Sequence, residues 1–185
     1  DDYKVAKQAD TLMAFYNLDK TEVDALLAEM RYALPEDYLE RNLNYYIART
    51  SHGSTLSRVV HARLAAMVGN KALSTQLYED ALGSDYVDIQ GGTTGEGIHA
   101  GVMAGTILIA LNTFAGISFR SEHLTINPDL PEKWETMAFA LTFKGVNYQF
   151  ELNKTSTRLC ANRAVVVNYK GRLNHLIENV WTELN

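Results

Sequence analysis

The sequence predicts a mixed fold, with helices up to residue 117 and a small β domain from residue 118 to residue 185. Before residue 118, apolar side chains recur every three or four positions, which is the spacing of an amphipathic helix. After it, apolar and polar side chains alternate, which is the spacing of a half-buried strand. With 185 residues, 46% of them hydrophobic, the chain is long enough to bury a core.

Six helices are expected in the first region. The second opens with Thr21 and Asp24 in capping-box positions, and Pro35 suits the first turn of the third. Glycine follows the fourth and the fifth, where a helix typically ends. The predicted helices cover residues 5–16, 21–34, a segment that begins at Pro35, and residues 56–68, 71–82 and 96–115.

The sixth predicted helix, residues 96–115, is apolar almost throughout. A helix that is apolar all round is normally buried on every side. Gly101 and Gly105 lie four residues apart on it and would let neighbouring helices approach closely. We therefore expect this helix to be buried among other helices.

The second region contains an expected β-hairpin with one apolar face. Residues 137–143 and 146–152 alternate in character, and Lys144-Gly145 between them suits a tight turn. The aromatic side chains from Phe139 to Phe150 recur on one face of these strands. This alternation predicts that they belong to a core.

Further strands are expected at residues 124–126 and 164–169, with a second turn at Lys170-Gly171. Residues 127–131 have the composition of a loop. The tail, residues 172–185, has apolar side chains at helical spacing, yet it follows a hairpin signal. Strand and helix therefore both remain open for the tail.

Composition excludes several classes of function. The 17 basic and 22 acidic residues give a net charge of −5, which argues against a protein that coats nucleic acid. The single cysteine, Cys160, excludes an intrachain disulfide and a cysteine zinc site, and it fits a reducing compartment. Residues 98–117 form the longest weakly polar stretch, but three glycines, a His and an Asn predict a buried helix there and no membrane span.

Two loops combine glycine, hydroxyl side chains and histidine, and each leads directly into a predicted helix. They cover residues 49–57 and 90–99. Glycine lets backbone N–H groups approach a ligand, hydroxyls add donors, and a helix N-terminus attracts negative charge. Together these features favour an oxyanion such as phosphate. Helix capping alone is the alternative for each loop, and the sequence does not show that the two loops meet in space.

The loops do not fit a nucleotide-binding fold. Neither contains the Gly-Lys-Ser/Thr of a Walker motif, and neither has the GxGxxG pattern after a strand. Instead, residues 50–57 and 88–99, together with Val5-Ala6-Lys7-Gln8-Ala9-Asp10, resemble segments of the inverting disaccharide phosphorylases of glycoside hydrolase family 65. These are maltose, trehalose and kojibiose phosphorylases. The resemblance runs from residue 3 to about residue 155.

The resemblance implies a fold and a reaction. Residues 1–117 would form the C-terminal half of an (α/α)6 catalytic barrel, and residues 118–185 a small antiparallel β-sandwich-like domain. The reaction would convert an α-linked glucosyl disaccharide and phosphate into β-glucose 1-phosphate and a released sugar. Phosphate would be a co-substrate, and no cofactor, metal, nucleic acid or membrane would be required. The full-length enzyme would be a cytoplasmic homodimer.

The resemblance also assigns roles to individual residues. Lys7 and Gln8 match the pair that contacts the glucose to be transferred. His99 matches the residue expected to contact phosphate most directly. Glu96 is more typical of a helix start than of a catalytic base. The expected phosphate-binding residues are Ser51, His52, Gly53, Ser54 and Thr55 in the first loop, and Thr93, Thr94, Gly97 and His99 in the second.

The family's general acid is a glutamate that would lie upstream of this chain, so no catalytic residue is expected within it. An inverting phosphorylase needs only that acid, because phosphate arrives as an anion and replaces the water that a base would activate. We therefore expect the chain alone to be inactive, with part of the apolar stripe of residues 96–115 uncovered.

Two other functions remain open at this point. A hydrolase of the same family, similar to a trehalase or a kojibiose hydrolase, would use water where the phosphorylase uses phosphate. A non-catalytic carbohydrate-binding module would instead need aromatic side chains on an exposed strand face. His61, His123 and His175 match no motif and are expected to be structural.

Overall fold

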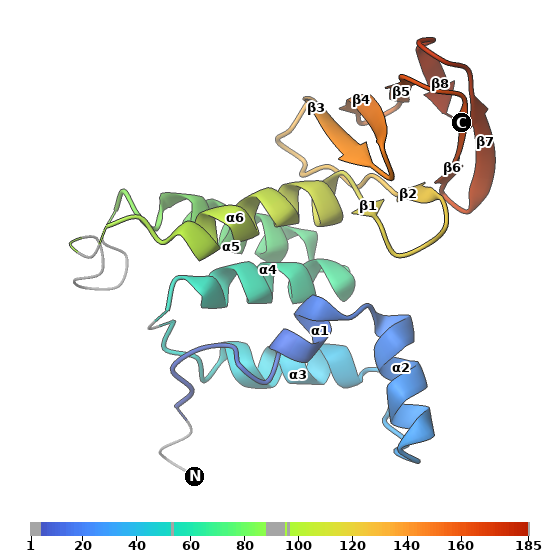
Figure 1. The fold of residues 1–185 in the computed structure, drawn as a ribbon. Helices are drawn as coiled ribbons and strands as arrows, with labels where there is room; N and C mark the ends of the chain where they lie inside the picture. Colours follow the sequence, from blue (N-terminus) through green and yellow to red (C-terminus); the bar gives the residue numbers. More distant parts are fainter. Residues whose placement is uncertain (1–4, 53, 88–94, 96, 185) are drawn as a thin grey trace. The chain divides into compact units, whose positions relative to one another are not determined.

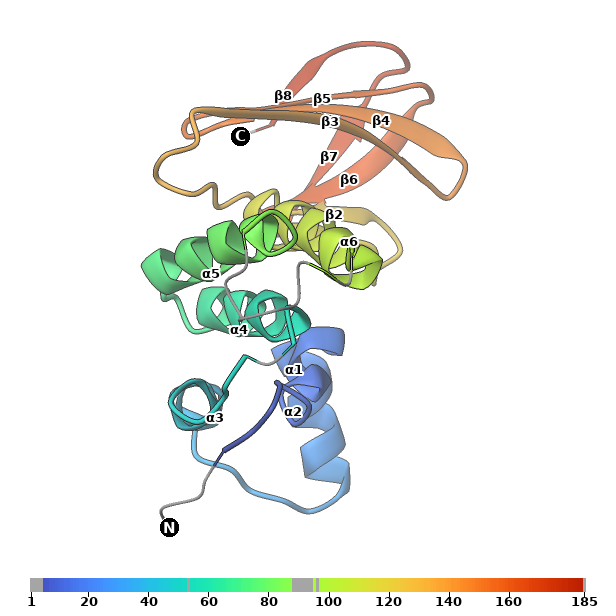
Figure 2. The same ribbon diagram turned by 90° about the vertical axis from the view of Figure 1, so that its left-hand side faces the viewer.

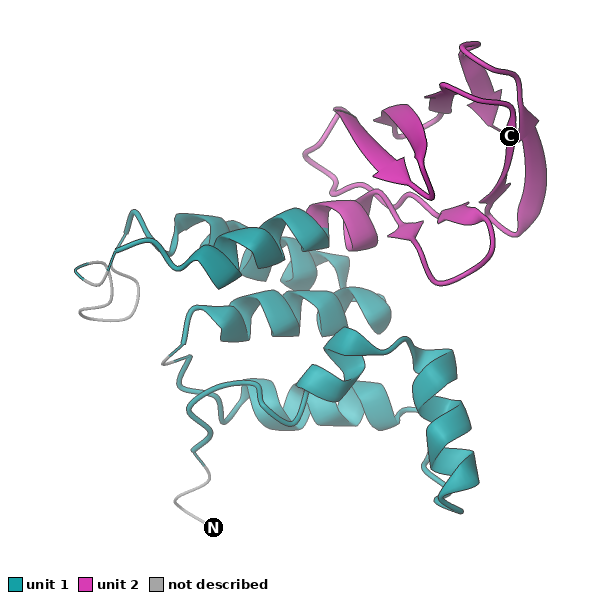
Figure 3. Cartoon of the chain, viewed as in Figure 1, with its two compact units in different colours: residues 1–109 teal, residues 110–185 magenta. Residues whose placement is uncertain are grey.

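The computed structural model describes residues 5–52, 54–87, 95 and 97–184. The chain divides into two compact units at residues 109 and 110, which Figure 3 shows in different colours. The first unit is helical and the second is built from strands (Figure 1). Among the described residues, no helix is both long enough and apolar enough to cross a membrane.

The first unit contains six α-helices among its described residues, as the sequence predicts. α4 and α5 match the expected ranges to within a residue, and Asn70 caps α5 by accepting a hydrogen bond from the Leu73 N–H at 3.1 Å. The buried Ser74 hydroxyl of α5 donates to the Ala62 carbonyl of α4 at 2.8 Å, which ties the two helices together. The six helices are α1 (Met13–Asn17), α2 (Lys20–Glu29), α3 (Tyr38–Ile47), α4 (Leu56–Met67), α5 (Lys71–Gly83) and α6 (Ala100–Ile109).

The first three helices begin later or end earlier than expected. The prediction of a helix over residues 5–16 is wrong before Met13, because the backbone of Ala6 pairs with Thr50 instead. The capping box of α2 is formed by Asp19 and Glu22, since the Asp19 carboxylate accepts from the Glu22 N–H at 2.9 Å. The prediction that Thr21 opens the second helix is therefore wrong by two residues. The prediction that the third helix begins at Pro35 is also wrong, because α3 begins at Tyr38.

The sixth expected helix is shorter than its apolar run. α6 ends at Ile109, and η2 (Ala110–Phe114), a π-helical turn, follows it. Burial on all sides is wrong, because Ile107 is 62% exposed and Leu108 is 45% exposed. Close helix contact is confirmed at Gly105, where an added Cβ would lie 2.9 Å from Val59 of α4, but Gly101 has nothing within 4 Å of such an atom.

The second unit contains two four-stranded sheets. One has the order β3-β4-β5-β8 and is antiparallel throughout. The other has the order β1-β2-β6-β7 and includes one parallel pair, β2 with β6, which the prediction of a purely antiparallel domain did not contain. The strands are β1 (Ile117–Ser118), β2 (Leu124–Ile126), β3 (Thr136–Phe143), β4 (Val146–Asn153), β5 (Thr157–Ala161), β6 (Val165–Tyr169), β7 (Arg172–Leu176) and β8 (Thr182–Leu184).

Both predicted tight turns are confirmed. Lys144 and Gly145 have φ values of 48° and 75°, and Lys170 and Gly171 have values of 48° and 83°. Two successive residues with positive φ are the requirement of the turn that best joins right-twisted strands. The tail after the second turn forms β7 and β8, so the open choice between strand and helix is settled as strand.

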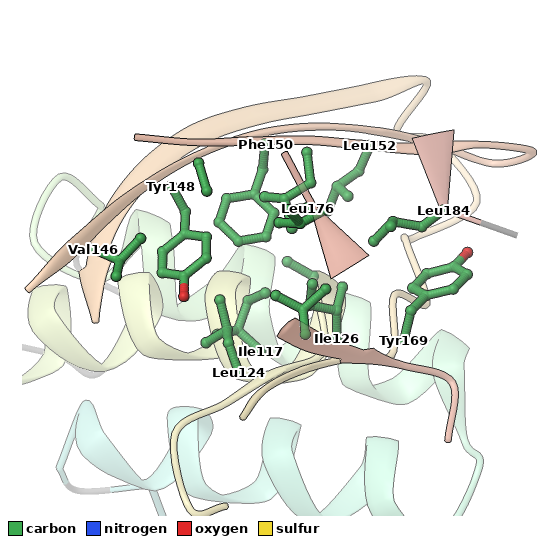
Figure 4. Close-up of a cluster of buried hydrophobic side chains, with 14 residues drawn as sticks. Ile117, Leu124, Ile126, Val146, Tyr148, Phe150, Leu152, Tyr169, Leu176 and Leu184 are labelled. Carbon is green, nitrogen blue, oxygen red and sulfur yellow. The ribbon is translucent and has the colours of Figure 1, made fainter. Parts of the chain in front are cut away.

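The core of the second unit lies between its two sheets (Figure 4). Tyr148, Phe150 and Leu152 of β4 point toward Leu124 and Ile126 of β2. The alternation along β4 is strict, because every second side chain is buried and those between are exposed. Phe139 stacks on Phe150 with 4.5 Å between the ring centroids. The prediction that these aromatic side chains form a core is confirmed.

We expect the substitution of Gly116 by alanine to cause a large and specific loss of stability. Its φ is +63°, and an added Cβ would lie 1.8 Å from the Asn127 carbonyl oxygen, so Gly116→Ala must displace the backbone. We expect a loss of about 2–4 kcal/mol in the free energy of unfolding, measured by urea titration.

Gly145→Ala is the matched control. Gly145 also has positive φ, at +75°, but an added Cβ would meet nothing within 4 Å. Its cost is therefore limited to backbone strain of about 1 kcal/mol. Equal losses for the two variants would show that the contact with Asn127 does not matter.

Candidate functional site

The segment that holds Lys7 and Gln8 lies directly beside the first predicted loop. The Ala6 N–H donates to the Arg49 carbonyl at 2.9 Å, and the Ser51 N–H donates to the Ala6 carbonyl at 2.9 Å. The Ser51 hydroxyl also reaches the Lys7 carbonyl at 3.4 Å. Two of the three predicted motifs, which are more than 40 residues apart in sequence, therefore meet through their backbones.

The hydroxyls of Thr50 and Thr55 in the first loop do not cap the start of α4. Thr55 precedes α4 and is buried, yet it makes no side-chain capping hydrogen bond to the helix. Thr50 instead donates to the Tyr46 carbonyl at 2.7 Å, which closes the end of α3. Gly53 lies outside the described residues. The Ser57 and Arg58 N–H groups at the start of α4 donate instead to the Ser54 and Thr55 carbonyls, at 3.1 Å and 3.3 Å.

His52 and His61 form a pair of imidazoles near the start of α4. Their ring centroids are 5.2 Å apart, and the rings are tilted by 66°. Burial, followed by the nearby His61 and Arg58, lowers the pKa of His52 to about 4. Burial also lowers the pKa of His61, whose Nδ1 lies 2.7 Å from the Ser57 carbonyl. Both rings are neutral at neutral pH, so they can exchange hydrogen bonds without adding charge.

Three buried polar atoms in the first two turns of α4 have no hydrogen-bond partner among the described residues. They are Ser57 Oγ, Arg58 Nη1 and His61 Nε2. Buried polar atoms in folded proteins are nearly always paired with protein, water or a ligand. Ser57 is 1% exposed and His61 is fully buried, so the cost of leaving them unpaired is high. The sequence analysis missed this role of His61, although it lies one helical turn after Ser57 on the same face.

The second loop is described only at its end. Thr93 and Thr94 lie outside the described residues, and Gly97 is exposed with a φ of 93°. His99 immediately precedes α6 and is held by Asp85, a residue that the sequence analysis did not single out. The Asp85 carboxylate accepts from the His99 N–H at 2.9 Å and lies 2.7 Å from His99 Nδ1. No spacing rule would have identified Asp85, because it is 14 residues away from His99.

Helices α4 and α6 are neighbours that begin at the same end of the first unit, on the left of Figure 1 and facing the viewer in Figure 2. The contact of Gly105 with Val59 joins the second turn of α6 to the first turn of α4. Because a helix rises 1.5 Å per residue, the two N-termini lie within two turns of this contact. The structure therefore brings the first loop and His99 to the same end of the helical unit.

We expect the free energy of unfolding to depend on pH because of the histidine pair near the start of α4. Between about pH 6.5 and pH 4, the unfolded chain protonates His52 while the folded chain does not, so the free energy of unfolding falls as the pH is lowered. We expect His52→Asn to remove about 2 kcal/mol of this pH dependence, measured by urea titration at several pH values.

Asparagine suits this test because it tolerates the positive φ of 50° at His52. His175→Asn is the control, since His175 is exposed on β7. A pH dependence that His52→Asn leaves unchanged would contradict the neutral, buried state of His52.

Comparison with known proteins identifies the family. Residues 1–108 match the glycosyl hydrolase family 65 central catalytic domain, and residues 117–173 match the C-terminal domain of the same family. The chain is 44% identical over 162 residues to a trehalose 6-phosphate phosphorylase of Lactococcus lactis subsp. lactis (strain IL1403). The aligned region covers 88% of this chain and 21% of that protein. It is 29% identical over 180 residues to a kojibiose phosphorylase of Escherichia coli (strain K12). This aligned region covers 92% of this chain and 24% of that protein.

A solved structure agrees in fold. It is a putative kojibiose phosphorylase from the human microbiome, which matches with a TM-score of 0.74 and 23% identity, over 98% of this chain and 25% of that one. The chain thus spans about a fifth to a quarter of the length of these relatives. Because the central catalytic domain alone matches more than half of the chain, the chain belongs to glycosyl hydrolase family 65.

Proposed function

We propose that this chain is the C-terminal part of an inverting disaccharide phosphorylase and supplies its phosphate pocket. Residues 1–117 would be the C-terminal half of an (α/α)6 catalytic barrel, and residues 118–185 its β domain. The observation that carries this proposal is the placement of the first loop and His99 at one end of the neighbouring helices α4 and α6, with the segment of Lys7 against the first loop.

The pocket would bind phosphate through hydrogen-bond donors more than through net charge. The hydroxyls of Ser51, Ser54 and Thr55 are suitable donors. The neutral ring of His52 can donate without charge, whereas Nδ1–H of His61 faces the Ser57 carbonyl, so its Nε2 is an acceptor. Ser57 Oγ is buried without a partner among the described residues, which supports a ligand at this position. Thr93, Thr94, Gly97 and His99 would complete the pocket from the second loop.

A pocket with little charge suits the reaction. In an inverting hydrolase, one carboxylic acid protonates the leaving oxygen and a second carboxylate activates water. Phosphate is already an anion at neutral pH, so the pocket has only to hold it beneath the anomeric carbon. The required acid would be a glutamate upstream of this chain. Positioning alone accounts for a large part of such a rate enhancement.

The sugar would lie near Lys7 and Gln8. The Lys7 side chain is exposed, and the Gln8 amide donates to Asp10 at 2.8 Å, so short side-chain movements would bring both to a bound glucose. The 44% identity with a trehalose 6-phosphate phosphorylase favours a trehalose-type disaccharide as the substrate. We expect the full-length protein to act as a homodimer in the cytoplasm, as in the family that it resembles.

The decisive experiment measures the phosphate dependence of disaccharide cleavage by the full-length protein that carries this chain. We expect cleavage of an α-linked glucosyl disaccharide only when inorganic phosphate is present, with β-glucose 1-phosphate as the product. The chain of 185 residues alone should produce none, because it lacks the general acid.

Release of free glucose at the same rate without phosphate would contradict the proposal and favour a hydrolase. Binding of the disaccharide without any cleavage by the full-length protein would favour a carbohydrate-binding module. The anomeric configuration of the sugar phosphate, followed by proton NMR, separates an inverting from a retaining reaction.

A further inference from the structure

Asp85 holds His99 at two points with one carboxylate. One oxygen accepts from the His99 backbone N–H at 2.9 Å, and the other lies 2.7 Å from Nδ1 of the ring. The Asp85 side chain is 4% exposed, and the His99 side chain is 29% exposed. The same carboxylate therefore fixes both the backbone at the start of α6 and the direction of the imidazole.

The chemistry of the pair determines where the ring carries its proton. The hydrogen bond from His99 lowers the pKa of Asp85, so the carboxylate is ionised and can only accept. Nδ1 of His99 must therefore carry a hydrogen. Under that constraint, Nε2 is a hydrogen-bond donor only when the ring is protonated and positively charged.

We propose that Asp85 is a positioning residue for phosphate, which orients His99 so that the ring meets the anion through Nε2–H as an imidazolium. This inference rests on the proposed function, because it takes His99 to be a phosphate contact. It gives the pocket one positive charge that is balanced by Asp85, beside the neutral His52 and His61. The Arg58 guanidinium, whose Nη1 is also buried without a partner among the described residues, is the other positive group at the start of α4.

Asp85→Asn tests the role with little change in shape. An amide has one acceptor oxygen where the carboxylate has two, so it cannot accept from both the backbone N–H and Nδ1–H of His99. We expect the KM for phosphate to rise about 10- to 100-fold in the full-length protein, as for other residues that orient a ligand-binding histidine. The KM for the disaccharide should stay within about twofold, and partial unfolding cannot mimic this result, because it lowers the apparent kcat and leaves both KM values unchanged.

Asp37→Asn is the matched control. Asp37 lies just before α3, and its carboxylate also holds a basic side chain, at 2.8 Å from Arg41 Nε, but this pair is exposed. The control should leave both KM values unchanged. Asp85→Glu retains the charge and should keep the KM for phosphate closer to that of the wild-type protein than Asp85→Asn does.

Long-range proton–nitrogen NMR of the His99 ring, without phosphate, tests the positioning independently of activity. We expect hydrogen on Nδ1 in the wild-type protein and its loss from Nδ1 of the neutral ring in Asp85→Asn. A neutral wild-type ring with hydrogen on Nε2 alone would overturn the inference, even if the variant failed to fold.

The kinetic outcomes separate the two proposals. If wild-type cleavage needs no phosphate, the proposed function is wrong and the inference falls with it. If cleavage needs phosphate but Asp85→Asn retains the wild-type KM for phosphate and the wild-type ring tautomer, only the role of Asp85 is overturned.

Discussion

The close approach of α6 to α4 is the constraint on which the candidate site depends. Gly105 lies against Val59 so closely that even a methyl group would lie 2.9 Å from the valine side chain. Because the contact joins early turns of both helices, it sets their N-termini at one end of the helical unit. A larger residue at Gly105 would separate the helices and, with them, the two loops that precede α4 and α6. The site is therefore determined by packing in the core as much as by its own polar residues.

Apart from Arg58, the polar residues around these helix starts are neutral or have their charge balanced. Burial keeps His52 and His61 neutral, and Asp85 balances the charge that His99 carries when it is protonated. Hydrogen-bond donors at helix starts attract an anion without a cluster of lysines or arginines. Such a pocket fits a co-substrate that must bind, react and allow its product to leave, since excessive affinity would slow release.

Local sequence patterns predicted the β unit better than the helical unit. The alternation along β4 and the two Lys-Gly turns depend on neighbouring residues, so their signals are strong. The short α1 and the partner of His99 depend on contacts between distant segments. Ala6 pairs with Thr50, and Asp85 reaches over 14 residues, so no window of the sequence contains both partners. The exposure of Ile107 agrees with the expectation that part of the apolar stripe of residues 96–115 is uncovered in this chain.

The central claim is that the two loops form a single phosphate pocket. A crystal structure of the full-length protein with bound phosphate tests it most directly. We expect one phosphate whose oxygens accept hydrogen bonds both from residues 51–55 and from His99. Phosphate bound to only one loop, or loops that face separate cavities, would contradict it.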